Sequence, residues 1–230
     1  MNIPTKTIPW LSVLMFCGAV HAGSNHNPAS MNYVDTQVAL LNAKIPSFSV
    51  GDTFQGGTVY YVDSTGQHGL MFYDNLADTI QVRLINQGAT GYTINTYASG
   101  VGAGVQNTAA WNAALLANSG TASTSNVGGA AAYAAQFNLT ASGAQCTRPS
   151  AGSLSTEECY GGYYLPSLNE FELLVNSGLF NPTSDAIWWT STSNSVGATT
   201  VFAVSYASGS YTVIDSDPTT GHQVIPIRQF

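Results

Sequence analysis

The sequence predicts an α+β domain over residues 47–230, and two observations lead to this expectation. Patterns of two apolar strands around a turn occur near both ends of this range, at residues 58–73 and 201–216. Three helical patterns lie between them. Antiparallel hairpins combined with helices are typical of the α+β class. A chain of 230 residues suits one substantial domain, and a second full domain is not expected.

The N-terminus predicts a secretory signal peptide over residues 1–22. One basic residue, Lys6, precedes an apolar run from Ile8 to Val20, and small residues follow up to Ala22. This run is too short to cross a bilayer, and no other run approaches the ~20 residues that a membrane helix needs. We therefore expect an exported protein that does not span a membrane, located outside the cell or at the surface of a Gram-negative bacterium, with the periplasm as the alternative.

Residues 23–46 predict a polar linker followed by an oligomerisation helix. Ser30 is a suitable N-cap, and Pro46 ends the helix. An isolated helix of ~15 residues is marginal in water, so its apolar stripe needs a partner. The partner is either other copies of the chain, with a homotrimer expected, or the chain's own domain. The stripe follows the core spacing of a coiled coil and consists of Val34, Val38, Leu41 and Ile45.

The domain opens with a predicted β-hairpin. Its strands cover residues 58–62 and 70–73, which are rich in apolar, aromatic and β-branched side chains, and a glycine-containing turn joins them. Residues 79–86 are expected to form a further strand or an extended segment. The glycine-rich residues 86–105 predict a loop.

Three helices are expected next. The first covers residues 107–120 and ends at a glycine, and the second covers the alanine-rich residues 126–139. The third begins after Ser167, because Ser167 and Glu170 form the pattern of a capping box that follows a proline. Its expected apolar face consists of Leu168, Phe171 and Leu174.

The C-terminal part predicts strands again. Residues 201–216 alternate around the turn Ala207-Ser208-Gly209-Ser210 and predict a second hairpin. The last strand is expected to bring the C-terminus back beside the first hairpin.

Charge is sparse and mostly negative. Charged residues make up 7% of the chain, with a formal charge of −7. Beyond the signal peptide the chain has four basic residues and twelve acidic ones. So few scattered cations cannot form the basic patch that nucleic-acid-binding proteins need, and this class is excluded.

The cysteines predict one disulfide. Removal of the signal peptide takes away Cys17 and leaves Cys146 and Cys159, an even pair in an exported protein. The alternative is a metal site, but no His lies near either cysteine and two thiolates do not complete a tetrahedral site.

Several dispersed motifs in one order carry a resemblance to a known family. They are GGTVYYVDSTGQHGL at 56–70, GAGVQNT at 102–108, GGYYLPSLNEFELL at 161–174, WWTST at 188–192 and IPIRQF at 225–230. Over residues 48–230 the chain resembles the C-terminal domain family of the Legionella collagen-like protein, a subset of the C-type-lectin-like and formylglycine-generating-enzyme-like folds.

The resemblance implies a compact C-type-lectin-like domain with a non-enzymatic binding function, as in adhesins and surface proteins. In the namesake the domain is trimeric on a collagen stalk and binds sulfated glycosaminoglycans and similar polyanions. This chain departs from that pattern in two respects. It has only the short helix in place of a Gly-X-Y stalk, and it is acidic, which puts a sulfate-binding patch in doubt.

Two kinds of side chain are candidates for ligand binding. Lys44, Arg83 and Arg148 could bind an anionic polymer, because guanidinium groups match sulfate and carboxylate in bidentate geometry; the alternative is a surface cation or an internal ion pair. Sugar rings could stack on Trp188, on its neighbour Trp189 or on Tyr206. For the tryptophans, burial in the core is the alternative.

Metal binding and catalysis have weaker signals. Asp215 and Asp217 are spaced by two in a turn and are the candidate calcium ligands, with solvated turn carboxylates as the alternative; no other cofactor is expected. His68 follows Asp63 in a turn, but no G-x-S-x-G nucleophile motif accompanies them. We therefore expect no enzymatic activity.

These observations lead to one expected function and one alternative. The expected function is an exported, adhesin-like binding module, a homotrimer that recognises glycans or other surface polymers. The alternative is a structural or protein–protein interaction component of a pilus, secretion system or other surface assembly.

Overall fold

The computed structural model describes residues 33–39, 46–75, 80–85, 96–119, 129–147, 158–195 and 199–230. The chain divides into two compact units, Met1–Ile45 and Pro46–Phe230. In the first unit, residues 33–39 form a helix on which Val34 and Val38 are exposed. Leu41 and Ile45, the other two members of the predicted stripe, lie outside the described residues, as does the predicted signal peptide. Association through this stripe stays a prediction.

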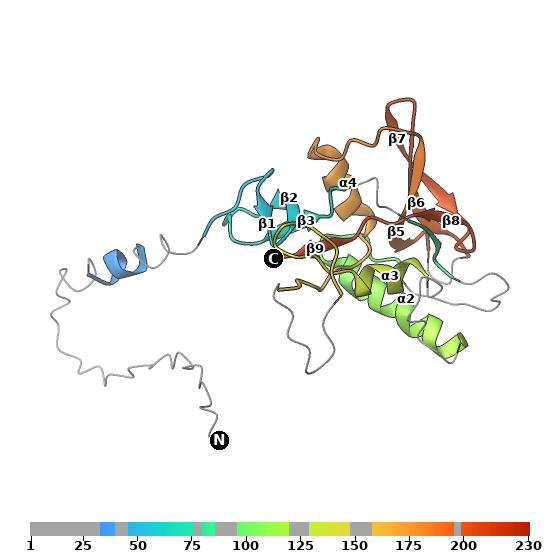
Figure 1. Ribbon diagram of the computed structural model, residues 1–230, viewed down its shortest axis with the longest axis horizontal. Helices are drawn as coiled ribbons and strands as arrows, with labels where there is room; N and C mark the ends of the chain where they lie inside the picture. Colours follow the sequence, from blue (N-terminus) through green and yellow to red (C-terminus); the bar gives the residue numbers. More distant parts are fainter. Residues whose placement is uncertain are drawn as a thin grey trace, which may run out of the picture. The chain divides into compact units, whose positions relative to one another are not determined.

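The second unit contains a four-stranded antiparallel sheet, which we call sheet A (Figure 1). Its strands lie in the order β1 (Thr53–Phe54), β2 (Gly57–Val62), β3 (Gly69–Phe72) and β9 (Ile227–Gln229). β2 and β3 form the predicted first hairpin. β9 pairs with β3, which confirms that the C-terminus returns beside this hairpin.

A five-stranded mixed sheet, sheet B, lies beside it. Its order is β4 (Gln81–Arg83), β8 (Gly221–Gln223), β5 (Ala186–Ser193), β6 (Val201–Ala207) and β7 (Ser210–Ser216). Only the β5–β8 pair is parallel. β6 and β7 form the predicted second hairpin, and Ser208 and Gly209 at its tip have φ angles of 52° and 81°. Two central residues with positive φ match a type I′ turn, whose twist suits a two-residue hairpin.

The helices agree with the prediction in number but not always in extent. α2 (Ala103–Ser119) begins four residues earlier than predicted, inside the segment expected to be loop. Its early start is possible because Gly104 has no side chain: a Cβ there would collide with Glu170 Oε2 and lie 2.7 Å from the Leu165 carbonyl oxygen. The described part of the second helix, α3 (Ala130–Gln136), is shorter than expected. α4 (Leu168–Asn176) begins with the predicted capping box of Ser167 and Glu170.

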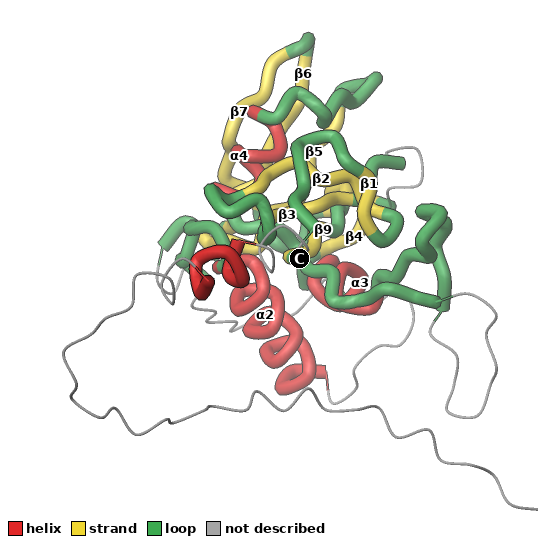
Figure 2. Tube along the Cα trace, turned by 90° about the vertical axis from the view of Figure 1, so that its left-hand side faces the viewer, coloured by secondary structure: helices red, strands yellow, loops and turns green. Residues whose placement is uncertain are grey.

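The core lies on both faces of sheet B. Trp188 and Trp189 are neighbours on β5 and point to opposite faces, because successive strand side chains alternate. Trp189 packs in one cluster with Trp111 of α2, whereas Trp188 packs in another with Phe171 of α4. α2 and α3 therefore cover one face and α4 the other, as Figures 1 and 2 show. The observed architecture is α+β, and within the described ranges no helix combines the length and apolarity needed to cross a membrane.

Candidate ligand-binding site

The glycine- and tyrosine-rich segment before α4 forms a buried polar junction centred on Glu170. The carboxyl group of Glu170 is fully buried and accepts hydrogen bonds from Gly102 N (2.8 Å), Tyr164 OH (3.2 Å) and Ser167 N (2.7 Å). Burial, and then the nearby Glu170, raise the pKa of Tyr164 far above its ordinary value. Tyr163, Tyr164 and Leu165 are all buried. This segment therefore joins the loop before α2 to α4, and its role is structural.

Of the three predicted cations, the described residues include Arg83. Arg83 is exposed on β4, whereas Arg228 lies on β9 of the other sheet, with its guanidinium carbon 6.0 Å from the centroid of the Tyr160 ring. Lys44 and Arg148 lie outside the described residues. Arg83 is thus the sole described member of the predicted cation set, and binding of an anionic polymer by the set stays a prediction.

The two predicted aromatic residues differ in accessibility. Trp188 is 1% exposed and its ring packs against Phe180, with 5.0 Å between the ring centroids. The expectation that Trp188 stacks on a sugar is therefore corrected: the even-numbered face of β5 is the one that α4 covers. Tyr206, on β6, is half-buried. Its ring lies 4.9 Å from that of Tyr211, the residue opposite it on β7.

Tyr206 belongs to the lining of a hollow at one end of sheet B, which we call the Tyr206 pocket. The pocket lies where β5 begins and β6 ends, beside β8 and β4, and has a volume of about 420 Å³. Its lining residues are Gln81, Asp185, Ala186, Ile187, Ser205, Tyr206, Ala207, Gly221 and His222.

The lining combines several different hydrogen-bonding groups with the aliphatic Ile187, whereas the ring of Tyr206 lies on the opposite face of sheet B, in the cluster of Trp188. Gln81 offers an amide, Ser205 a hydroxyl and Asp185 a carboxyl group. Asp185 also accepts a hydrogen bond from Ser208 N (3.2 Å), which ties the pocket to the β6–β7 turn. None of the described residues that line the pocket carries a permanent positive charge. Arg83 lies just outside the lining, paired in register with Gly221.

His222 forms a buried, uncharged part of the pocket wall. Its ring packs against Trp189 at 4.4 Å between centroids, and its Nε2 lies 2.6 Å from Ser216 Oγ. Burial lowers the pKa of His222, so the imidazole is neutral at pH 7. Ser216 is not among the lining residues, so this Ser–His pair does not present a nucleophile to the pocket.

The predicted calcium ligands have other partners. Asp217 Oδ1 accepts hydrogen bonds from Thr219 N (2.8 Å) and Thr219 Oγ1 (2.7 Å), and these bonds lower the pKa of Asp217. Asp215 accepts one from Asn194 Nδ2 (3.2 Å). In the part of the chain that the structure describes, no three His, Cys, Asp or Glu side chains gather as a metal site would require. The Asp217 contacts are those of a capped turn.

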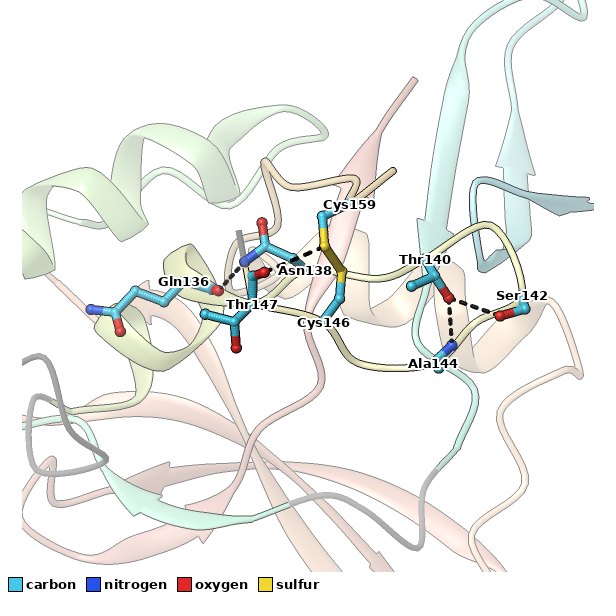
Figure 3. Close-up of a disulfide and its surroundings, with 8 residues drawn as sticks. All are labelled: Gln136, Asn138, Thr140, Ser142, Ala144, Cys146, Thr147 and Cys159. Atoms are coloured by element: carbon cyan, nitrogen blue, oxygen red, sulfur yellow. Dashed lines mark hydrogen bonds between the residues drawn. A yellow bond between two sulfur atoms is a disulfide. The ribbon is translucent and has the colours of Figure 1, made fainter. Parts of the chain in front are cut away.

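The predicted disulfide is present. Figure 3 shows the bond between Cys146 and Cys159, whose Cα atoms are 6.1 Å apart. The chain before it forms a tight turn in which Thr140 Oγ1 accepts from Ala144 N (3.2 Å). The backbone N–H of Cys146 donates to Asn138 O (3.1 Å), so the chain is hydrogen-bonded as far as the crosslink.

Sequence reasoning missed most of the pocket. Gln81, Asp185, Ser205 and His222 come from four separate segments, and no spacing in the chain connects them. Only Tyr206 and, at the border, Arg83 were candidates from the sequence. No protein-family model matches this sequence, and no curated protein matches it significantly, so the geometry of the pocket carries the functional argument.

Proposed function

We propose that the protein is an exported, non-enzymatic binding module that recognises glycans through the Tyr206 pocket. The observation that carries the proposal is the lining itself: amide, hydroxyl, carboxyl and imidazole groups beside the aliphatic Ile187 in a hollow of about 420 Å³. Concave sites with apolar surface and a few polar groups are typical of small-ligand binding. The resemblance to C-type-lectin-like adhesin domains supports the same function.

The lining favours uncharged or amino sugars over sulfated ones. Asp185 would repel a sulfate group, and burial keeps His222 neutral. Arg83 at the border is the one described cation close in register to the pocket. The bound class thus differs from the polyanions that the resemblance implies.

Binding to an array of neutral, amino and sulfated glycans, followed by calorimetry on those that bind, tests the proposal. We expect Gln81→Ala to weaken binding of a neutral glycan about tenfold, because the variant removes the amide group that the pocket offers to sugar hydroxyls. Gln136→Ala is the matched control, since Gln136 is exposed on α3 and does not line the pocket. Binding restricted to sulfated glycans, lost in Arg83→Ala and unaffected in Gln81→Ala, would contradict the assignment.

We further propose that the N-terminal helix makes the module trimeric, since three weak sites gain affinity through avidity. The exposed Val34 and Val38 support this proposal. Light scattering should give three times the chain mass for the purified protein and one chain mass for Val38→Asn. The control Asp35→Asn should remain a trimer. A wild-type monomer would refute trimerisation but would leave glycan binding untouched.

The second candidate function is a protein–protein interaction component of a surface assembly. The observation in its favour is the open edge of β7, none of whose residues line the Tyr206 pocket.

A further inference from the structure

β7 is an edge strand, and the register of its hairpin shows which backbone groups it leaves open. Among the described strands, β7 pairs with β6 alone, without a register shift, from Ala207↔Ser210 to Val201↔Ser216. Ala207 and Ser210 flank the two-residue turn and so form a hydrogen-bonded pair. In an antiparallel ladder, hydrogen-bonded and non-hydrogen-bonded pairs alternate. The N–H and C=O groups of alternate residues on β7 therefore point away from β6; these residues are Tyr211, Val213 and Asp215.

These outward groups have no partner within the part of the chain that the structure describes. No backbone or side-chain hydrogen bond between described residues reaches the main-chain atoms of Tyr211, Val213 or Asp215 from outside the β6–β7 ladder. Edge strands in soluble proteins are commonly blocked by lysine, proline or a bulge. β7 has none of these. Three alternate residues whose N–H and C=O groups point away from β6 form a template for an added strand.

A groove runs beside this edge on the face that α4 covers. It has a volume of about 260 Å³, and its floor is apolar, with Phe171 and Val175 from α4 facing Val204 and Val213 from the hairpin. Val213 is 44% exposed, so part of its side chain is accessible to a partner. Tyr211 closes one end, and its hydroxyl donates to Phe180 O (2.6 Å). The polar lining residues are Glu172, Asn176 and Thr212.

The charges near the edge select the kind of partner. Glu172 lines the groove and Asp215 stands on the open edge, both exposed, and no Lys or Arg is among the described residues that line the groove. Arg83 lies on β4, at the opposite edge of sheet B. A second copy joined edge to edge at β7 would bring more carboxyl groups to the same place. A basic segment would be attracted.

We propose that the open edge of β7 receives an extended, basic segment of a partner protein as an added strand. Residues directly opposite each other in neighbouring strands share a face of the sheet. The partner residue opposite Val213 thus lies over the groove and is apolar. The partner residue opposite Asp215, two positions away, is Lys or Arg. Backbone hydrogen bonds to Tyr211, Val213 and Asp215 hold the segment, and the groove and the two carboxyl groups select its sequence.

Fluorescence anisotropy with a synthetic peptide tests this directly. The probe is a labelled nine-residue peptide that alternates Thr with Leu and carries Arg two positions from its central Leu. We expect saturable binding that weakens with salt, and at least a tenfold loss when alternate peptide nitrogens are N-methylated. Val213→Pro should weaken binding at least tenfold, because it removes an outward N–H without breaking a bond to β6. Asp215→Lys, which keeps the backbone intact, should weaken it at least fivefold.

Glu158→Lys, the same change of charge in the segment beside the disulfide, is the matched control and should bind the peptide normally. Gln81→Ala, which changes the glycan pocket on β4 at the opposite edge of sheet B, should also bind it normally, and this separates the two surfaces. Absence of binding, or equal binding by the N-methylated peptide, would overturn the proposal. So would a doubling of mass in light scattering that Val213→Pro abolishes without any peptide binding, because the occupant would then be a second copy of the chain.

Discussion

Removal of the Glu170 carboxyl group should destabilise the domain strongly, although the group is polar. The group accepts three hydrogen bonds, from Gly102 N, Tyr164 OH and Ser167 N, and is fully buried. A hydrogen bond to a charged group contributes about 1.5–3 kcal/mol, and a buried donor left without a partner costs about 1–3 kcal/mol. Glu170→Ala strands all three donors, so we expect a loss of about 5 kcal/mol in the free energy of unfolding.

Glu170→Gln provides a finer test of the same reasoning. An amide keeps one accepting oxygen; the better orientation retains the bonds from Gly102 and Tyr164 and places an NH₂ group against Ser167 N–H. We expect a loss of about 2 kcal/mol for this variant. Both variants are measured by urea unfolding followed by tryptophan fluorescence. Glu172→Ala, two residues along α4 and exposed, is the control and should change stability by less than about 0.5 kcal/mol.

Wild-type stability in Glu170→Gln would refute this account. Such a result would mean that the free energy lost by burying the carboxyl group equals the free energy that its hydrogen bonds contribute, as happens for some buried charges.

Three further predictions concern the crosslink, acid stability and helix packing. Replacing Cys146 and Cys159 by serine should cost about 3 kcal/mol in denaturant unfolding, because the crosslink closes a loop with a sequence separation of 13; an unchanged midpoint would contradict this. Burial lowers the pKa of His222 below its ordinary value, so folding stability should fall as pH drops below about 6.5, and His222→Gln should flatten that slope between pH 7 and 5. Gly104→Ala should lower the free energy of unfolding by about 1–3 kcal/mol, whereas Gly100→Ala, with open space around it, should leave the thermal midpoint within a degree or two of wild type.

Features that depend on neighbours in the chain were predicted well. The turn at Ser208 and Gly209 fixed the second hairpin, and the pair Ser167 and Glu170 fixed the start of α4. The disulfide followed from the parity of the cysteines once the leader was set aside. In each case the determining contact spans few residues or is covalent, so the rest of the fold need not be known.

Prediction failed where distant segments meet. The start of α2 was placed too late because its glycines resembled loop composition. Gly104 is instead a helical residue that packs closely against Glu170 and Leu165, where a larger side chain would not fit. Trp188 was a candidate sugar platform because composition cannot tell which face of β5 a helix covers.

The sequence by itself determined the α+β class, the order of the elements, the α4 cap and the crosslink, because hydrophobic periodicity, turn chemistry and capping act over a few residues. The tertiary structure decided which side chains face solvent and which come together. The amide of Gln81, the carboxyl group of Asp185 and the hydroxyl group of Ser205 line one pocket only because β4, β5 and β6 are joined in one sheet through β8. The open edge of β7 likewise follows from its place at the end of the strand order, since an edge is a property of the sheet and not of the strand.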